Sequence, residues 1–441
     1  MALIRKYAEN LMLPIAVIGA GPMGLCTTRR LLEQGFDVVG FEIHDNVGGL
    51  WDINSATSTM YQSAHLISSK RMTEFHDFPM DDNVATYPRH DAMAQYFRDY
   101  AKQFDLTRHY RFSTRVEKIE KQQDHWRVDF SHGGQQDSIV VQAVMLANGT
   151  LHEPNRPTFA GQFDGERLHS ADYKDAAIFA GKRVLIIGCG NSGCDIAVDA
   201  VHRAASVDMV VRRGYYFLPK FVMGKPTDTL GGKLRLPNRI KQWVDGTLVR
   251  LISGKPSDFG LPDPNYRMYE SHPVVNSMFL HHIGHGDITV RPGIQSLQPK
   301  GVTFEDGSTA EYDLILEATG YKLHYPFIDA KHLNWQGDAP ALYLNTFTPA
   351  HDNLFVMGMV EASGLGWQGR DDQAQLVARF MQTRRDNPDK ALAFMHKVRR
   401  NCTSRIDGGL QYLNVARMAY YVHKQDYLQQ LKLDMAELAE G

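Results

Sequence analysis

Two glycine-rich segments carry the clearest chemical signal in this sequence. Residues 19–24 read Gly-Ala-Gly-Pro-Met-Gly and residues 188–193 read Gly-Cys-Gly-Asn-Ser-Gly, so both have the spacing GxGxxG. In this spacing the first glycine allows a tight turn, the second lets the backbone approach a pyrophosphate, and the third lets a helix pack closely on a strand. Amide groups at the start of the following helix then face the negative charge. Each segment is therefore predicted to bind a dinucleotide.

The elements around the first turn complete this pattern. A short apolar strand is predicted over 15–18, and the helix after the turn should end near Gly35. A second strand over 37–41 runs into Glu42. An acid at this distance from the turn accepts hydrogen bonds from a ribose. We assign this unit, at the start of the chain and with an acid, to FAD.

The second turn has similar surroundings but a different end. A strand over 184–187 leads into it, and the next strand, 207–211, ends in Arg212 and Arg213 instead of an acid. Cations at this position suit a 2′-phosphate, which favours NADPH over NADH. The alternative is a pair of solvated arginines at a strand end. Two such units on one chain predict two nucleotides.

Two further apolar strands mark the places where the chain crosses between domains. Residues 140–150 and 312–322 each end in a glycine-containing turn. We predict an α/β fold in which a discontinuous FAD-binding domain, residues 1–155 and 316–441, encloses an NADP-binding domain over 156–315.

The pattern of the second domain lapses over about 224–285. This segment is basic and holds Gly, Pro and scattered large apolar residues, so it is predicted to be an insertion in the NADP-binding domain. It caps the active site, touches a membrane surface or forms a solvated helix pair, and the sequence leaves these alternatives open.

The composition argues against several classes of partner. The 441 residues have a formal net charge of -2, with 43% apolar and 22% charged residues, so nucleic acid is not an expected partner. Four cysteines in this length indicate a reducing, cytoplasmic setting. No uninterrupted apolar run reaches the ~18 residues of a spanning helix, so no transmembrane anchor is expected.

Several motifs, taken together, resemble the flavin-containing monooxygenase family. Phe163, Gly165, His169 and Tyr173 fit its FxGxxxHxxxY signature, shortly before the second turn. Other similar segments are Gly48-Gly49-Leu50-Trp51, residues 70–80, residues 87–106 and the ATGY sequence at 318–321. The resemblance implies two Rossmann-like dinucleotide-binding domains with a glutathione-reductase-like build.

The resemblance also implies an NADPH- and O2-dependent FAD monooxygenase. NADPH would reduce FAD, O2 would add at the flavin C4a carbon, and the hydroperoxide would oxygenate nitrogen or sulfur of a small nucleophile. Because the cofactor carries this chemistry, no paired acid and base is required. The residues assigned to the two cofactors are Gly19, Gly21, Pro22, Met23, Gly24, Glu42, Gly49, Leu50, Trp51, Gly188, Gly190, Asn191, Ser192, Gly193, Arg212, Arg213, Thr319 and Gly320.

The sequence departs from the family pattern at Ile67. Family members often have an asparagine here, three residues before the aligned Lys70, and it is thought to support the flavin–oxygen adduct. Isoleucine cannot donate a hydrogen bond. Either Ser68 or Ser69 replaces the asparagine, or NADP⁺ mainly holds the adduct, or the adduct releases peroxide. His169 is a third candidate for a catalytic role, although a structural or coupling role in the linker is favoured.

Two other interpretations of the function remain open from the sequence. A Baeyer–Villiger enzyme acting on ketones resembles this family, but its signature typically has Trp where Tyr173 stands. A flavoprotein oxidase or reductase without oxygen transfer is the next alternative, and Cys189 and Cys194 have the spacing of a redox pair, although they lie in the wrong turn. The histidines at 281, 282 and 285 suggest metal ligands without completing a site, so no metal is expected. We also expect a homodimer whose substrate is an amine, a sulfide or a ketone.

Overall fold

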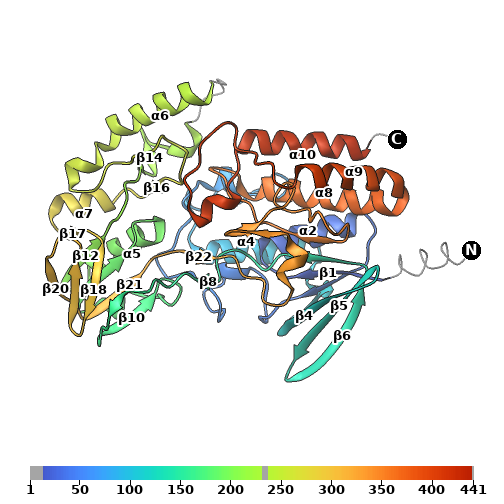
Figure 1. The fold of residues 1–441 in the computed structure, drawn as a ribbon, viewed down its shortest axis with the longest axis horizontal. Helices are drawn as coiled ribbons and strands as arrows, with labels where there is room; N and C mark the ends of the chain where they lie inside the picture. Colours follow the sequence, from blue (N-terminus) through green and yellow to red (C-terminus); the bar gives the residue numbers. More distant parts are fainter. Residues whose placement is uncertain (1–12, 231–236, 440–441) are drawn as a thin grey trace, which may run out of the picture.

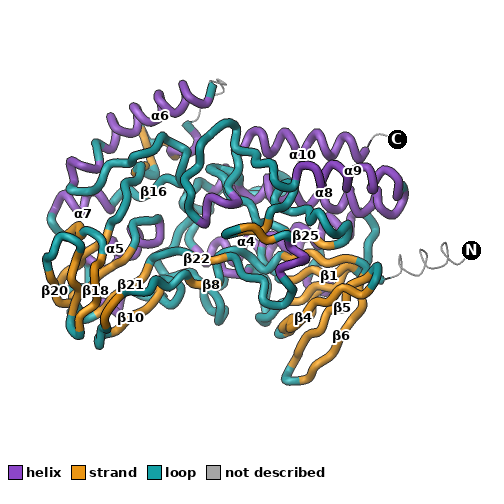
Figure 2. Tube along the Cα trace, viewed as in Figure 1, coloured by secondary structure: helices purple, strands orange, loops and turns teal. Residues whose placement is uncertain are grey.

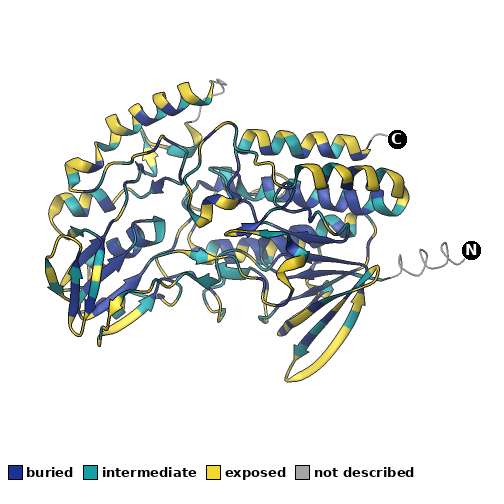
Figure 3. Cartoon of the chain, in the orientation of Figure 1, coloured by how far each residue is buried: buried dark blue, intermediate teal, exposed yellow. Residues whose placement is uncertain are grey.

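A computed structural model describes residues 13–230 and 237–439. Its helices and strands gather into two lobes, each built around a five-stranded sheet, with loops running between the lobes (Figures 1 and 2). The strands at the centre of each sheet are dark blue in Figure 3, because both of their faces are covered. This explains why their sequences are continuous apolar runs without alternation.

The first sheet combines strands from both ends of the chain. All of its strands are parallel, and their order is β25-β7-β1-β2-β3. The bounds are β1 (Ile15–Ile18), β2 (Val38–Phe41), β3 (Tyr110–Arg111), β7 (Ala143–Leu146) and β25 (Leu354–Val356). The helices of this lobe are α2 (Pro22–Glu33), α3 (Lys70–Thr73), α4 (His90–Gln103), α8 (Gly366–Asp386), α9 (Pro388–Asn401) and α10 (Lys424–Ala439).

The second sheet is also parallel, in the order β10-β21-β11-β12-β17. The bounds are β10 (Glu166–His169), β11 (Arg183–Ile187), β12 (Ser206–Val210), β17 (Ile288–Arg291) and β21 (Leu314–Glu317), with helices α5 (Asn191–Val201) and α7 (Phe279–His285). The chain leaves this sheet after β12 and returns at β17, and the excursion contains α6 (Asn238–Ser253). The domain bounds themselves stay a prediction.

Smaller sheets extend each lobe. An antiparallel sheet in the first lobe consists of β4 (Thr114–Gln122), β5 (His125–His132) and β6 (Gln135–Val141). A mixed sheet in the other lobe consists of β9 (Ala160–Gly161), β18 (Ile294–Gln298), β19 (Gly301–Phe304) and β20 (Thr309–Glu311), in which only β9 and β18 are parallel. The short pairs are β8 (Glu153–Pro154) with β22 (Tyr321–Lys322), β13 (Phe217–Leu218) with β16 (Val274–Val275), β14 (Phe221–Val222) with β15 (Lys225–Pro226), and β23 (Trp335–Gln336) with β24 (Ala339–Pro340).

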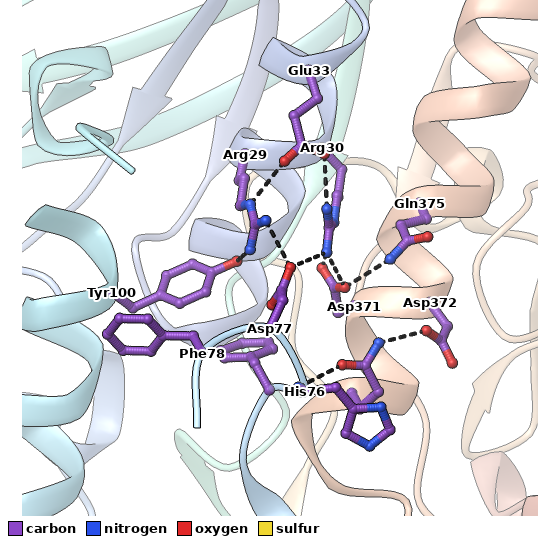
Figure 4. A network of polar contacts seen from close by, with 12 residues as sticks. Arg29, Arg30, Glu33, His76, Asp77, Phe78, Tyr100, Asp371, Asp372 and Gln375 are labelled. Atoms are coloured by element: carbon purple, nitrogen blue, oxygen red, sulfur yellow. Dashed lines mark hydrogen bonds and ion pairs between the residues drawn. The ribbon is translucent and has the colours of Figure 1, made fainter. Parts of the chain in front are cut away.

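A network of charged side chains fastens the last part of the chain to the first. Arg30 on α2 donates to both carboxylate oxygens of Asp371 on α8, over 2.8 and 2.6 Å, and Asp371 is fully buried. Arg29 and Arg30 both donate to Asp77, so the loop after α3 joins the same network (Figure 4). A two-point guanidinium–carboxylate contact fixes orientation as well as distance. It therefore holds α8 in register against α2.

Breaking this contact should destabilise the first lobe. We expect Asp371→Asn to lower the free energy of unfolding by about 3–5 kcal/mol, because Arg30 would lose its fully buried carboxylate partner and keep only the more exposed carboxylates of Glu33 and Asp77. Urea unfolding followed by tryptophan fluorescence measures the loss. Arg108→Ala is the control, since Arg108 and its partner Asp105 are both exposed, and it should cost less than about 1 kcal/mol. Equal losses in the two variants would contradict the role given to Asp371.

Candidate functional site

The first glycine-rich turn lies between β1 and α2, where the sequence predicts it. Gly19 has a φ of 106°, and a side chain on it would come within 2.6 Å of the Ala147 carbonyl oxygen. A side chain at Gly24 would overlap the Gly19 carbonyl oxygen. Both positions therefore admit only glycine, one through the turn and one through close packing of helix on strand.

The segment after β2 closes over this turn. The Gly48 amide donates to the Ala20 carbonyl over 3.0 Å. A side chain on Gly21 would meet the Gly49 Cα at 3.6 Å, so Gly49 lies beside the second glycine. Leu50 accepts a hydrogen bond from Ser58 through its carbonyl, and Trp51 is half-buried against the core. Gly48 to Trp51 and the turn thus form one unit.

Glu42 ends β2 and holds the backbone of the turn. Its Oε2 accepts from the Ala20 amide over 2.6 Å, and its Oε1 accepts from the His44 amide over 3.0 Å. Burial raises the pKa of Glu42 above its ordinary value, and these two amides partly offset the effect. The carboxylate therefore orders the turn itself, and each oxygen keeps accepting capacity for a ribose.

The second turn repeats the first in the other lobe. Gly188 has a φ of 108°, and a side chain on it would approach the Ala318 carbonyl oxygen to 2.5 Å. A side chain on Gly193 would overlap the Gly188 carbonyl oxygen, whereas one on Gly190 would meet no described atom within 4 Å. The side chain of Asn191 bonds the backbone of Pro273 and Val275, so it ties the turn to the end of the insertion.

Both helix starts fit the phosphates of a dinucleotide. Helix α2 begins with Pro22 and Met23, and helix α5 begins with Asn191 and Ser192. In these two described helices, the first turn carries no acidic residue and no side chain caps it. Their first amides are thus left for an anion. The residues present therefore fit FAD at the first turn and NADPH at the second.

The two arginines at the end of β12 have different surroundings. Arg212 is exposed, whereas Arg213 donates from Nε to the Tyr215 hydroxyl over 3.0 Å and lies 4.9 Å above its ring. Because β11 and β12 are parallel neighbours, Arg212 lies at the same sheet edge as the second turn. Arg212 is the freer of the two to meet a 2′-phosphate.

Thr319 and Gly320 lie where the chain crosses between the lobes. The Thr319 hydroxyl donates to the Asn155 carbonyl over 2.6 Å, and the Asn155 amide donates to the Gly320 carbonyl over 2.9 Å. The outgoing and returning crossings are therefore bonded to each other, beside Gly188. The sequence places both residues near the cofactor but does not reveal this pairing.

The FxGxxxHxxxY segment lies at the same crossing. The Phe163 ring covers Gly165 so closely that a side chain there would collide with it. His169 is fully buried, its Nδ1 accepts from the Ala171 amide over 3.1 Å, and its ring lies 5.3 Å from Tyr321. Burial lowers the pKa of His169, so the imidazole is neutral. These contacts favour a structural or coupling role, and its catalytic role stays untested.

Tyr173 and Lys174 join the motif to both lobes. The Tyr173 hydroxyl donates to Asp199 on α5 over 2.8 Å, and its ring lies 5.3 Å from Tyr61 of the first lobe. The Lys174 ammonium donates to the carbonyls of Ser58 and Met60, the latter over 3.1 Å. The motif is thus a bonded link between the segment that closes the first turn and the helix that follows the second.

The segment around Ile67 contains the two serine candidates. The Thr73 hydroxyl donates to the Ser69 carbonyl over 2.8 Å, so the 2.7 Å contact between Ser68 and Thr73 uses the Ser68 hydrogen. The Ser69 hydroxyl is buried, and within the described residues it has no hydrogen-bond partner. Ser69 therefore keeps a free donor, whereas Ser68 does not. Ile67 itself is half-buried beside them.

The insertion reaches this segment through Asp228, a residue that sequence reasoning missed. The Ser69 amide donates to Asp228 Oδ2 over 2.6 Å. Nearby, the Tyr87 hydroxyl donates to the Lys220 carbonyl, and its ring meets Phe221 edge to face. The insertion thus bridges the second lobe to the loop of the serine candidates. No motif marks Asp228, because its partner lies 159 residues away in sequence.

Two further groups of side chains, the cysteines of the second turn and the histidines of α7, do not form reactive sites. The thiols of Cys189 and Cys194 lie 3.6 Å apart inside the second turn, and burial raises the pKa of Cys194, which makes it an unreactive thiol. The rings of His281 and His285 are 3.9 Å apart, but among the described residues no group of three or more potential ligands could hold a metal. No helix in the described ranges is long and apolar enough to cross a membrane.

Two dinucleotide turns, bonded through one linker, define a flavoprotein oxidoreductase with a second nucleotide site. The flavin-binding monooxygenase-like family model matches residues 13–436, so the chain belongs to this family. Flavin-containing monooxygenase 3 of Oryctolagus cuniculus is 32% identical over 83% of this chain and 73% of its own length. Flavin-containing monooxygenase 2 of Homo sapiens is 31% identical over 96% and 82%, respectively.

Solved structures support the fold prediction. An open cyclohexanone monooxygenase has a TM-score of 0.71 at 20% identity and covers 97% of both chains. S-allyl-L-cysteine S-oxygenase from Allium sativum has a TM-score of 0.66 at 19% identity and covers 96% of this chain and 88% of its own. These structures confirm the predicted α/β fold with two dinucleotide-binding domains, and the family model and the curated relatives confirm the family. The protein is an FAD- and NADPH-dependent monooxygenase by family, which confirms the cofactors. The individual site residues stay predictions.

Arg212 should select the nicotinamide cofactor. We expect Arg212→Ala to raise the KM for NADPH roughly tenfold or more, because a charge-assisted contact to the 2′-phosphate is lost. The KM for NADH, which lacks this phosphate, should stay unchanged. Steady-state kinetics with both cofactors measures the difference. Arg108→Ala, which removes an exposed arginine at 70% exposure in the first lobe, is the control. Equal effects on both cofactors would contradict the assignment.

Asp195 on α5 should make stability depend on pH. Burial raises its pKa from 3.8 to about 6, although Lys220 and Asn276 oppose the shift. An acid with a raised folded-state pKa stabilises the fold while protonated, and this contribution is lost as the pH rises from about 4 to 6. Asp195→Asn should therefore gain stability relative to the wild type across that window and hold the gain above it. Thermal unfolding of both proteins from pH 4 to 8 measures this difference. Melting temperatures that change in parallel with pH in the wild type and in Asp195→Asn would contradict the prediction.

Proposed function

We propose that this enzyme oxygenates nitrogen or sulfur atoms of small soft nucleophiles, using NADPH and O2. The observation that carries the proposal is the bonded link from Lys174 and Tyr173 to the two turns. It provides a rigid path by which occupancy of the NADPH turn affects the flavin side. The family resemblance predicts that a flavin C4a-hydroperoxide carries the oxygen, and this stays a prediction.

Tyr173 favours heteroatoms over ketones. Its hydroxyl bonds Asp199 over 2.8 Å, at the signature position where ketone-oxidising relatives typically have Trp. A relative from Oryctolagus cuniculus that is 31% identical bears the name dimethylaniline monooxygenase (N-oxide-forming). The Allium sativum structure is named for S-oxygenation and the cyclohexanone monooxygenase for a ketone, but these two are similar in fold only.

The bound flavin supplies the oxidising chemistry, and the chain supplies geometry and exclusion of water. Glu42 and the glycines order the first turn, and the helix starts receive the phosphates. Ser69 is the residue near Ile67 that keeps a free hydroxyl donor in the described structure, so we assign it the support that asparagine gives in relatives. No protein acid or base is required, because an amine or sulfide attacks with its own lone pair.

Two alternatives have specific observations in their favour or against them. Baeyer–Villiger oxygenation is the alternative that the similarity in fold to cyclohexanone monooxygenase suggests. A disulfide reductase would need reactive thiols beside the flavin, whereas Cys189 and Cys194 are buried in the second turn. Homodimer formation and the choice among amine, sulfide and ketone substrates stay predictions.

A substrate panel tests the proposal directly. NADPH consumption, product and peroxide are measured with N,N-dimethylaniline, a dialkyl sulfide and cyclohexanone. We expect the amine or the sulfide to give an N-oxide or S-oxide with product matching the NADPH consumed. Lactone from cyclohexanone without heteroatom oxide would favour the Baeyer–Villiger alternative. NADPH oxidation that yields only peroxide with all three would contradict the proposal.

The link between the turns should set how well NADPH consumption is coupled to product. We expect Tyr173→Phe to slow flavin reduction roughly tenfold and to raise the peroxide released per NADPH, because a hydrogen bond to a carboxylate is lost. Stopped-flow absorbance and a peroxide assay measure the two effects. Tyr312→Phe is the matched control, since its hydroxyl donates to Asp208 over 2.6 Å in the same lobe, away from the link. If both variants had the same rate of flavin reduction and released the same peroxide per NADPH, Tyr173 would act through packing only.

A further inference from the structure

The insertion of the second lobe places one carboxylate against the segment of the serine candidates. Asp228 accepts the Ser69 amide through Oδ2 over 2.6 Å. Its other oxygen, Oδ1, is buried and has no hydrogen-bond partner among the described residues. A carboxylate oxygen that leaves water without gaining a donor is destabilised. Oδ1 therefore requires a partner that this part of the chain does not provide.

The Ser69 hydroxyl is a second unpartnered group at the same contact. Ser69 is only 2% exposed, and within the described ranges its hydroxyl has no hydrogen-bond partner. Its amide holds the other oxygen of the Asp228 carboxylate, so covalent geometry keeps the hydroxyl close to Oδ1. A hydroxyl donates one hydrogen and accepts through two lone pairs, whereas a carboxylate only accepts. One ligand group that carries several donors therefore satisfies both.

This contact lies on the side of the first nucleotide turn. The loop after β25 begins at that turn, where a side chain on Gly358 would meet the Met23 side chain at 2.8 Å. The same loop reaches the serine segment, where a side chain on Gly366 would approach the Met72 carbonyl oxygen to 2.4 Å. Because Asp228 comes from the other lobe, its carboxylate lies between the lobes, where a substrate would approach a flavin bound at the first turn.

The groups that face Asp228 leave its negative charge without a bonded cation in the described structure. Lys424 at the start of α10 is within electrostatic reach, because Asp228 opposes the fall in the pKa of Lys424 that burial causes. The Lys424 ammonium nevertheless donates to the Gly364 carbonyl, and Oδ1 stays unpartnered. Burial, together with the charge of Asp228, raises the pKa of Tyr87 to about 12, so Tyr87 is neutral, and its hydroxyl donates to the Lys220 carbonyl.

From these observations we propose that Asp228 and Ser69 bind the ammonium group of a cationic substrate. This inference rests on the proposed function and names its substrate class, a small sulfide or amine that carries a second, protonated nitrogen. An ammonium group brings three N–H donors and a positive charge, so it bonds Oδ1 and the Ser69 oxygen together. The Ser69 hydrogen stays available for the flavin side. Because a protonated nitrogen has no lone pair, the other soft atom of the substrate is the one oxygenated.

Matched sulfides test this assignment with the FAD-loaded enzyme and NADPH. The cations are ω-(methylsulfanyl)alkylamines with two to four methylene groups, and each neutral partner has a methyl group in place of the ammonium. Asp228→Asn keeps an oxygen for the Ser69 amide but removes the charge. We expect it to lower the cation-to-neutral ratio of kcat/KM roughly tenfold or more, through KM, because a charge-assisted hydrogen bond is lost. The anionic 3-(methylsulfanyl)propanoate should gain relative to the neutral sulfides, since a repulsion is removed.

Asp245→Asn is the matched control, because it removes the same charge from the same insertion, where Asp245 pairs with Lys241. It should leave the cation-to-neutral ratio unchanged, and retained flavin absorbance shows that each variant is folded. Calorimetry with the oxidised, NADP⁺-loaded enzyme measures the Kd of the same compounds without turnover and should show the same change.

The outcomes separate this assignment from the proposed function. A ratio and a Kd that Asp228→Asn leaves unchanged, or that both variants change equally, would overturn the assignment and leave Oδ1 to a water molecule. Binding of the cations that depends on Asp228, with no sulfoxide from any compound, would support the assignment and contradict the proposed function alone.

Discussion

The double crossing between the two lobes is the constraint on which the rest of this structure depends. The outgoing chain at Asn155 and the returning chain at Thr319 and Gly320 are bonded to each other. The pairing of β8 with β22 continues this contact. Because the crossing lies beside Gly188, the position of the second nucleotide turn is set by the same backbone that enters and leaves its lobe.

The first lobe depends on the return of the chain in a second way. β25 is hydrogen-bonded to β7 and completes the sheet from a segment more than two hundred residues further along the chain. The Arg30–Asp371 contact then fixes the helix after β25 against the helix of the first turn. A charge pair with a fully buried carboxylate tolerates little displacement, since separating it leaves that buried charge uncompensated. The two halves of this lobe are thus held in one arrangement.

The two turns show how one geometry serves two nucleotides. In each, the first glycine faces a carbonyl oxygen of a neighbouring strand end, Ala147 in one lobe and Ala318 in the other. What differs is the end of the second strand: Glu42 is buried and bonded to the turn, whereas Arg212 is exposed. The signature segment links the two, because Lys174 bonds the first lobe and Tyr173 bonds α5.

The sequence by itself determined the parts that rest on local contacts. GxGxxG turns, their flanking strands and the residue that ends the second strand are specified within about thirty residues, since turn sterics and helix–strand packing are short-range. Only the tertiary structure decided which distant groups meet. It paired Asp228 with Ser69, left Ser69 and not Ser68 with a free donor, and turned the apolar side of α6 outward. Helical periodicity shows that a helix has an apolar face, but the direction of that face depends on polar contacts made by its other side, here by Gln242 and Gly246 with Met268.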